Sequence, residues 1–165
     1  MAELAPSRLL KILSVLTRHR VDFLLVGGAA AIVQGAPIST FDLDILVPRE
    51  SSGEQLLAAL TELNARYVDP AGRYIVPDPV KIATLKLHQL VTDFGPLDVM
   101  TSIGDGLTYA DLVAETSEQE VGGVKVRVLS LGAVIRSKEQ ANRDKDRMAL
   151  PVLRRTLEIL ERGRP

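Results

Sequence analysis

The chain has 165 residues, of which 46% are apolar, 25% charged and 4% aromatic, with a formal net charge of −1 and no cysteine. This composition is that of an ordinary globular protein, and it excludes collagen-like, disordered and disulfide-framed classes as well as zinc–thiolate sites and thiol nucleophiles. Because no stretch approaches roughly 18 uninterrupted apolar residues and the first residues do not form a signal peptide, we expect a cytoplasmic protein without a membrane segment.

The first part of the chain alternates predicted helices and strands. Ser7 is expected to cap the first helix, and Ser51 or Ser52 a later one, because each precedes leucines that recur at helical spacing. Short apolar runs that end at glycine or proline are typical of buried strands. The elements predicted here are helices over 7–20, 29–34 and 52–63, and strands over 23–26 and 41–47.

The second part contains two predicted hairpins and two closing helices. Its predicted elements are a strand over 73–76, hairpins over 88–101 and 120–129, a helix over 109–115, a helix from Ser130 to about 142, and a last helix from Asp144 or Asp146. Strands and helices interleave with short connections. The sequence therefore predicts an α/β (α+β) fold, in which a mixed β-sheet is covered by helices on at least one face.

Two Asp-x-Asp pairs occur in different surroundings. Asp144 and Asp146 lie in a charged run at a predicted helix start, where we interpret them as solvated covering. Asp42 and Asp44 interrupt an apolar strand and project from one side of it. Because like charges repel, this pair either lies on an exposed edge face or holds a divalent cation. Asp98 is a lone acid in a later apolar strand, and it joins the pair if the two strands are neighbours.

A double glycine precedes the acids by one short helix. Gly27 and Gly28 connect a predicted strand to a helix, where the missing Cβ atoms let the backbone approach a phosphate, although many such pairs are plain tight turns. Asp42 follows 14 residues after Gly28, so the glycine bend and the acidic strand can be adjacent. The hydroxyls of Ser39 and Thr40 either bond a phosphate or merely begin the strand.

The charge is unevenly distributed along the chain. The last 30 residues hold 9 Lys and Arg against 5 Asp and Glu, whereas the rest of the chain is acidic. A solvated C-terminal helix explains this asymmetry, and so does a basic surface that faces an anion. The few, scattered aromatic residues argue against a stacking platform for single-stranded nucleic acid.

Taken together, Gly27-Gly28, Thr40-x-Asp42-x-Asp44 and the lone Asp98 resemble the motifs of the nucleotidyltransferase superfamily with a polymerase-β-like core. The nearer resemblance is to small bacterial members such as abortive-infection type toxin nucleotidyltransferases, and the more distant one is to aminoglycoside and lincosamide nucleotidyltransferases. The run 129–146 resembles the lysine-rich helix and Lys-Asp element that often follow. The resemblance implies one nucleotidyltransferase-like domain over 1–165, with a core at about 20–102 and a C-terminal β/helical extension at about 103–165.

The resemblance also implies a role for each motif residue. Asp42, Asp44 and Asp98 would be catalytic and would bind two Mg²⁺ or Mn²⁺ ions, with Asp98 on the acceptor side as the base or its orienter. The NTP phosphates would contact Gly27, Gly28, Ser39, Thr40 and Lys138, with Arg136, Arg143 and Lys145 as further candidates. The chain departs from the common pattern in having Gly-Gly where Gly-Ser is frequent, and Ile38-Ser39 where a basic residue is frequent.

The implied reaction transfers a nucleoside monophosphate from an NTP to an acceptor hydroxyl, on tRNA, a protein or a small molecule, and releases pyrophosphate. An alternative is a catalytically lapsed member that acts as a binding or regulatory partner, for instance in a toxin–antitoxin pair. A carboxylate-pair hydrolase is a third hypothesis, which the shared face of the two acids disfavours. Since the chain has little room for a separate acceptor domain, we expect a homodimer or a partner protein.

Overall fold

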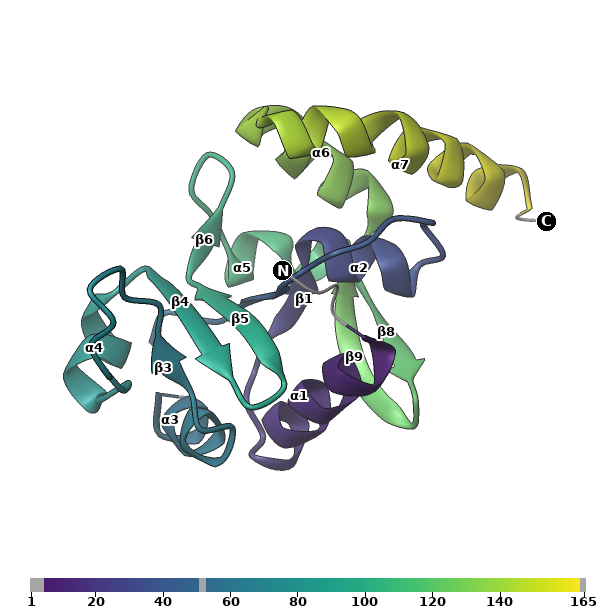
Figure 1. Cartoon of the computed structure of the whole chain (residues 1–165). Coiled ribbons are helices and arrows are strands. Elements are labelled where there is room, and N and C mark those ends of the chain that lie inside the picture. Colours follow the sequence, from purple (N-terminus) through teal and green to yellow (C-terminus); the bar gives the residue numbers. More distant parts are fainter. Residues whose placement is uncertain (1–4, 51–52, 164–165) are drawn as a thin grey trace.

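A mixed β-sheet of seven strands lies at the centre of residues 5–50 and 53–163, the part of the chain that the structure, a computed structural model, describes (Figure 1). In sheet order the strands are β3 (Arg66–Tyr67), β4 (Leu87–Thr92), β5 (Gly95–Met100), β2 (Leu43–Leu46), β1 (Leu24–Val26), β9 (Val124–Leu129) and β8 (Thr116–Val121). Strand β1 is parallel to β9, and β2 is parallel to β5, whereas the other neighbours are antiparallel. The mixed sheet expected from the sequence is confirmed.

Helices cover both sides of this sheet, with α1 and α3 on one side and α2, α6 and α7 on the other (Figure 1). The helices are α1 (Pro6–Arg18), α2 (Gly27–Val33), α3 (Gly53–Glu62), α4 (Pro79–Thr84), α5 (Tyr109–Leu112) with a 3-10 turn (Val113–Glu115), α6 (Leu131–Ala141) and α7 (Asp144–Arg162). A separate short pair, β6 (Ser102–Ile103) and β7 (Leu107–Thr108), follows β5. Within the described ranges no helix combines the length and apolarity needed to cross a bilayer.

Alternation along β2 and β5 separates the core from the acidic face. Leu43, Ile45, Leu97 and Val99 have no exposed surface. Burying each of these side chains contributes about 1.5–3 kcal/mol, so the register of the two strands is firmly set. The residues between them, which include the acids, project from the opposite face. Helix α2 packs on the β1 half of that face and α6 packs against α2, whereas Leu87 and Gln89 of β4, on the same face, are exposed.

Gln34 connects the end of α2 to the start of α6. Its side-chain amide donates hydrogen bonds to the carbonyl oxygens of Leu129 at 2.7 Å and Ala30 at 3.0 Å. Its carbonyl oxygen accepts a bond from the backbone N–H of Leu131 at 3.2 Å. The amide therefore satisfies backbone groups on two helices and on the end of β9 at once.

The hairpins and the closing helices agree with the prediction, whereas some boundaries do not. The two expected hairpins are formed by β4–β5 and β8–β9, and Ser130 caps α6 by accepting from the backbone of Ala133. Ala5 rather than Ser7 is the N-cap of α1, because Pro6 occupies the first helical position, where its missing N–H costs nothing. The caps expected at 51–52 lie outside the described residues.

The proline-rich stretch differs most from the expectation. The strand predicted over 73–76 is wrong: this segment contributes a single backbone bond, from the N–H of Tyr67 to the carbonyl of Ile75. Helix α4 was not predicted, although Asp78 caps it by accepting from Lys81 and Pro79 begins it. An Asp-Pro start signal was present there, but the prolines at 77 and 79 obscured any period.

Candidate active site

Three carboxylates meet where β2 and β5 lie side by side. Asp44 and Asp98 are register partners in this parallel pair, so they project from the same face of the sheet. Asp42 lies just before β2 and turns toward them. One oxygen from each of the three side chains lies within 4.8 Å of the others. Strands β2 and β5 are therefore neighbours, which is the condition under which Asp98 was expected to join Asp42 and Asp44.

Burial and mutual repulsion raise the pKa of two of these acids. The pKa of Asp44 rises to about 7, chiefly because the carboxyl is buried and then because Asp42 and Asp98 are nearby. The pKa of Asp98 rises to about 6 for the same reasons, burial first and Asp42 next. Lys145 lowers both values in part. Such a cluster gains stability from a cation that its oxygens can share.

The glycine bend touches the acids directly. Gly27 has φ +63°, a left-handed conformation, and begins α2 immediately after β1. A Cβ atom built on Gly27 would lie 2.5 Å from Oδ2 of Asp44, which is too close for any side chain. A Cβ on Gly28 would lie 3.2 Å from the side chain of Thr40. The bend therefore has room for hydrogen atoms alone beside the carboxylates.

Ser39 and Thr40 lie at the mouth of the same site. Both line the cavity in front of the acids. The hydroxyl of Thr40 donates to the backbone carbonyl of Asp42 at 3.0 Å, so one task of this side chain is to hold the turn that enters β2. Asp42 owes its position to this turn, because it lies outside the strand that was expected to carry it.

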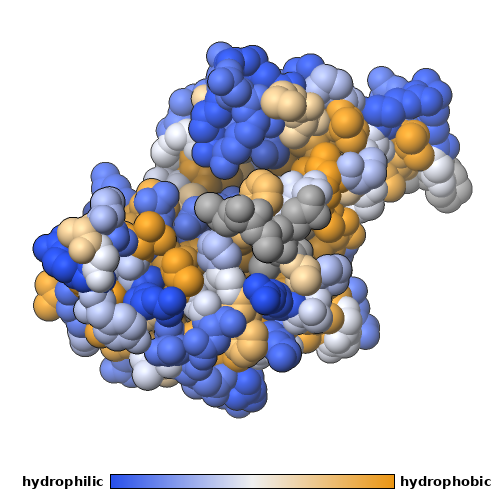
Figure 2. Space-filling model, viewed as in Figure 1, coloured by the Kyte–Doolittle hydropathy of each residue, from blue (hydrophilic) through white to orange (hydrophobic). Residues whose placement is uncertain are grey.

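A cavity of about 410 Å³ opens in front of Asp42 and Asp44. Figure 2 shows the notch to which it belongs, between the hydrophilic junction of α6 and α7 above and the part of the molecule with β4 and β5 below. Its wall brings together segments far apart in the sequence, namely the glycine bend, residues 38–42, the β5–β6 region, α6 and the start of α7. Among the predicted site residues, those lining it are Gly27, Gly28, Ser39, Thr40, Asp42, Asp44 and Lys138.

The wall opposite the carboxylates is basic. Lys138 on α6, with Arg143 and Lys145 beside the start of α7, lines the cavity. Arg136 does not: it pairs with Glu115 on the outside of the molecule. Of the further basic candidates from the sequence, the structure thus places two at the cavity and one away from it.

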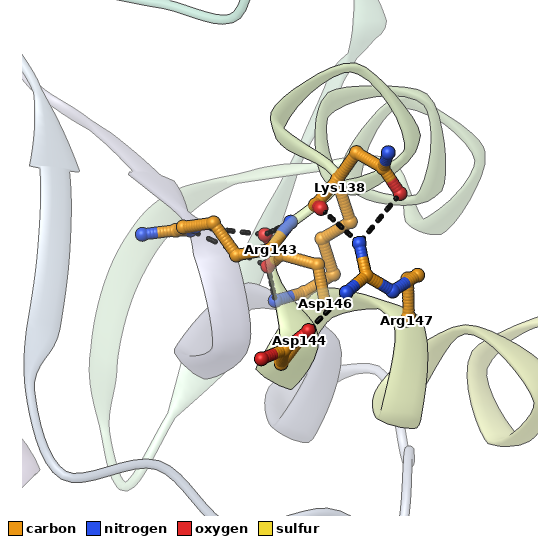
Figure 3. Close-up of polar contacts among 6 residues, drawn as sticks. Lys138, Arg143, Asp144, Asp146 and Arg147 are labelled. Carbon is orange, nitrogen blue, oxygen red and sulfur yellow. Dashed lines mark hydrogen bonds and ion pairs between the residues drawn. The ribbon is translucent and has the colours of Figure 1, made fainter.

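Asp146 anchors this basic wall and corrects our interpretation of the second Asp-x-Asp pair (Figure 3). Its carboxylate has no exposed surface and accepts bonds from Arg143 and Lys138, whereas the side chain of Asp144 is 91% exposed and pairs with Arg147. Asp144 is a solvent-exposed charge at the helix start, as expected, but Asp146 is buried and forms ion pairs with two basic side chains. The sequence alone did not distinguish them, because the burial of Asp146 depends on how α6 meets α7.

The strand pair that follows β5 also reaches the cavity. Met100, Ser102, Ile103 and Gly104 line it, and the sequence analysis gave this segment no role. A Cβ on Gly104, which has φ +55°, would lie 2.3 Å from the side chain of Gln140 on α6. The segment after β5 and helix α6 are therefore in close contact at the wall of the cavity.

The raised pKa values predict how excess Mg²⁺ would change the thermal stability of the protein. A carboxyl whose pKa is higher in the fold than in the unfolded chain contributes stability at low pH and loses it as pH rises through the folded-state value, here about 6 for Asp98 and about 7 for Asp44. Excess Mg²⁺ should therefore raise the unfolding temperature at about pH 8 and change it little at about pH 5. Thermal unfolding by circular dichroism checks this, and equal effects of Mg²⁺ at both pH values would contradict it.

The chain is similar to known adenylyltransferases along most of its length. Residues 8–151 match the family model of aminoglycoside-2''-adenylyltransferase. The solved lincosamide antibiotic adenylyltransferase LnuA, bound to lincomycin, superposes with a TM-score of 0.66 at 15% identity, covering 93% of this chain and 98% of LnuA. The solution structure of ANT(2'')-Ia superposes with a TM-score of 0.60 at 15% identity, covering 94% of this chain and 88% of ANT(2'')-Ia. The crystal structure of an antigenic nucleotidyltransferase-like protein from Paracoccidioides brasiliensis superposes with a TM-score of 0.53 at 18% identity, covering 92% of this chain and 78% of that protein.

These matches correct the order of the two resemblances. No match is found among curated proteins. At such low identities the solved structures establish the fold, and the family model establishes the family. The resemblance to abortive-infection toxins is not supported, since the family match lies in the branch that the sequence analysis placed further away. The fold, the arrangement of motifs and this match lead to one conclusion: the chain belongs to the aminoglycoside-2''-adenylyltransferase family of the nucleotidyltransferase superfamily.

Proposed function

We propose that the chain is a metal-dependent adenylyltransferase that moves AMP from ATP to a hydroxyl group of a small molecule. The observation that carries the proposal is the meeting of Asp42, Asp44 and Asp98 within 4.8 Å, beside a cavity with a basic opposite wall. Clustered carboxylates suit divalent cations, and a basic wall suits a triphosphate. Membership of an adenylyltransferase family supports the same reaction.

The donor set fits Mg²⁺ or Mn²⁺. All three side chains offer hard oxygen ligands, and their mutual repulsion is relieved when a cation lies between them. Asp42 and Asp44 would hold the ions, with Asp98 completing the site on the acceptor side. Bound ions of this kind offset phosphate charge and lower the pKa of a coordinated hydroxyl.

Transfer requires a proton acceptor near the attacking hydroxyl. As the acceptor oxygen forms its bond to the α-phosphorus, the bond from that phosphorus to the bridging oxygen breaks and pyrophosphate leaves. We assign Asp98 as the group that takes the hydroxyl proton. Its carboxylate lies within reach of Asp42 and Asp44, with one oxygen of each within 4.8 Å of the others, and it is ionised near neutral pH because its pKa is about 6.

The phosphates would lie between the glycine bend and the basic wall. Gly27 and Gly28 line the cavity beside the carboxylates with backbone alone, and Ser39 and Thr40 line it as well. Lys138 on the opposite wall supplies positive charge to offset the charge of the departing pyrophosphate. The C-terminal helices therefore supply the positive charge. The residue before Ser39, where a basic side chain is frequent, is the apolar Ile38 in this chain.

The open sheet face beyond Asp98 favours an acceptor with an apolar surface and little charge. Gln89 on β4 is the register partner of Asp98, and Val68 bonds to Gln89 through the backbone, so these side chains share the face. Leu87, two residues before Gln89 on β4, lies on the same face. The exposed fraction is 47% for Leu87 and 58% for Val68. Within β3, β4 and β5 the charged side chains of this face are Asp98 and, at its far edge, Arg66. A polycation finds no further carboxylate there.

The test is transfer of label from ATP with Mg²⁺ and a panel of hydroxyl acceptors. We expect product with lincomycin, which has an alkyl chain and a single basic amine, at a kcat/KM at least about tenfold above that with tobramycin, a polycation. The panel also includes tRNA and a protein acceptor. Faster transfer to tobramycin would contradict the preference derived from the sheet face.

The same assay separates the alternatives that the sequence left open. A catalytically lapsed partner protein would give no label transfer with any acceptor and no Mg²⁺-dependent ATP binding. A carboxylate-pair hydrolase would act without ATP. Label that depends on ATP, on Mg²⁺ and on Asp44 would exclude both.

A further inference from the structure

Asp146 is a buried carboxylate that is bonded from two directions (Figure 3). Its Oδ2 accepts from the backbone N–H of Arg143 at 3.1 Å and from Nε of the same residue at 2.8 Å. Its Oδ1 lies 3.3 Å from Nη2 of Arg143 and 3.4 Å from Nζ of Lys138. With no exposed surface, this carboxylate cannot exchange its partners for water, so it holds both cations in place.

The two cations also interact with the catalytic carboxylates. Lys138 lowers the pKa of Asp44 from across the cavity. The pKa of Arg143 is raised first by Asp146 and then by Asp44 and Asp42. Each cation therefore stands between an acid behind it, Asp146, and acids in front of it that the proposed reaction assigns to metal ions.

We propose that Asp146 is a positioning residue that holds Lys138 and Arg143 back from the carboxylates in front, and so keeps Asp42 and Asp44 open to divalent cations. The inference rests on the proposed function. Without Asp146 the ammonium of Lys138, whose side chain is only 15% exposed, loses its buried partner, and Asp44, whose pKa it already lowers, is a carboxylate with which it can pair instead. An ion pair formed there competes directly with Mg²⁺ or Mn²⁺.

The neighbouring Asp144 provides a matched control. It lies two residues away in the first turn of α7, but its side chain is 91% exposed and its partner is Arg147, which does not line the cavity. Asp144→Asn removes a negative charge from the same helix start without freeing a cation at the cavity. A general effect of charge on α7 would appear in both variants, whereas the positioning role would appear in Asp146→Asn alone.

Binding of Mn²⁺, measured by electron paramagnetic resonance in the absence of ATP and acceptor, tests the proposal. We expect Asp146→Asn to weaken Mn²⁺ binding about tenfold, the scale of an outer-shell partner of a metal site, and Asp144→Asn to leave it unchanged. The double variant Asp146→Asn/Lys138→Met removes the released cation, so its Mn²⁺ affinity should recover by several fold. Its affinity for ATP should not recover, because Lys138 is then missing from the phosphate side.

Opposite outcomes are informative for different parts of the argument. Unchanged Mn²⁺ binding in Asp146→Asn, or a double variant no better than the single one, would overturn the positioning role. Failure of the wild-type chain to bind Mn²⁺ would instead overturn the proposed function. Should Asp146→Asn fail to fold, Lys138→Met alone is measured: with Asp146 intact it should bind Mn²⁺ a few fold more tightly, and weaker binding would overturn the proposal.

Discussion

Asp44→Asn is expected to lower kcat/KM for adenylyl transfer by on the order of 1,000-fold, the upper end of the loss seen when one preorganised stabilising group is removed from a reaction centre. Asp44 lies at the centre of the site. It is the register partner of Asp98 on the neighbouring strand, faces the glycine bend and lines the cavity. The amide has the same shape as the carboxyl but carries no charge for a divalent ion. Steady-state pyrophosphate release with ATP and Mg²⁺ measures the effect.

The same substitution should stabilise the metal-free protein. The pKa of Asp44 is about 7 in the fold, against 3.8 for the ordinary side chain, so the ionised form is destabilising above neutral pH. Removing that charge at about pH 8 should raise the free energy of unfolding by about 2 kcal/mol, after allowing for solvent screening. Urea denaturation checks this. A variant that loses activity together with stability would point to damaged folding rather than to a lost ligand.

Gly27→Ala is expected to lower kcat/KM by about 100-fold, since displacing a reacting group by about 1 Å can have an effect of that size. The new methyl group would lie 2.5 Å from Oδ2 of Asp44, so the carboxylate must move away from its partners. The left-handed conformation of Gly27, φ +63°, adds a backbone cost of about 1–2 kcal/mol. Steady-state kinetics and urea denaturation measure the two effects separately.

Gly35→Ala is the matched control for that substitution. Gly35 also has a positive φ, +96°, but a Cβ atom there would meet nothing within 4 Å. The Gly35→Ala variant should therefore lose stability through backbone strain but keep the wild-type rate of adenylyl transfer. If the two alanine variants lost activity equally, strain in the backbone rather than the collision with Asp44 would explain the result at Gly27.

The candidate acids were predictable because an acid inside an apolar strand is a local signal. Asp44 and Asp98 each stand between residues that become fully buried, and the alternation alone places them on the opposite face. What the sequence could not supply was the neighbour relation of the two strands, since nearly fifty residues and a hairpin partner separate them. The structure supplies it by pairing β2 with β5.

The anchoring role of Asp146 was missed for the opposite reason. Its local sequence is a run of charged residues, which is typical of an exposed helix start. Its burial arises from contact between two helices that meet at a left-handed Asn142, and from a lysine eight residues earlier. No periodicity within α7 carries this information, so Asp144 and Asp146 were treated alike.

The branch of the superfamily was also beyond the reach of the motifs. Under the proposed function, the glycine bend and the three acids would serve the nucleotide and the metal ions, which an adenylyl transfer needs whatever its acceptor is. The acceptor would distinguish the branches, and in our proposal it contacts side chains such as Gln89 and Leu87 on β4. These residues form no recognisable motif in the sequence and become a surface only when the sheet is assembled.

The amide of Gln34 has a consequence for how the cleft can open. By bonding to the end of β9 and to the first turn of α6, it couples the helix that carries Lys138 to the helix that begins at the glycine bend. Under the proposed function, the two walls of the cavity that face the triphosphate would therefore move together. The wall of the cavity that is free to move for nucleotide entry would then be the short β6–β7 strand pair, which belongs to neither helix.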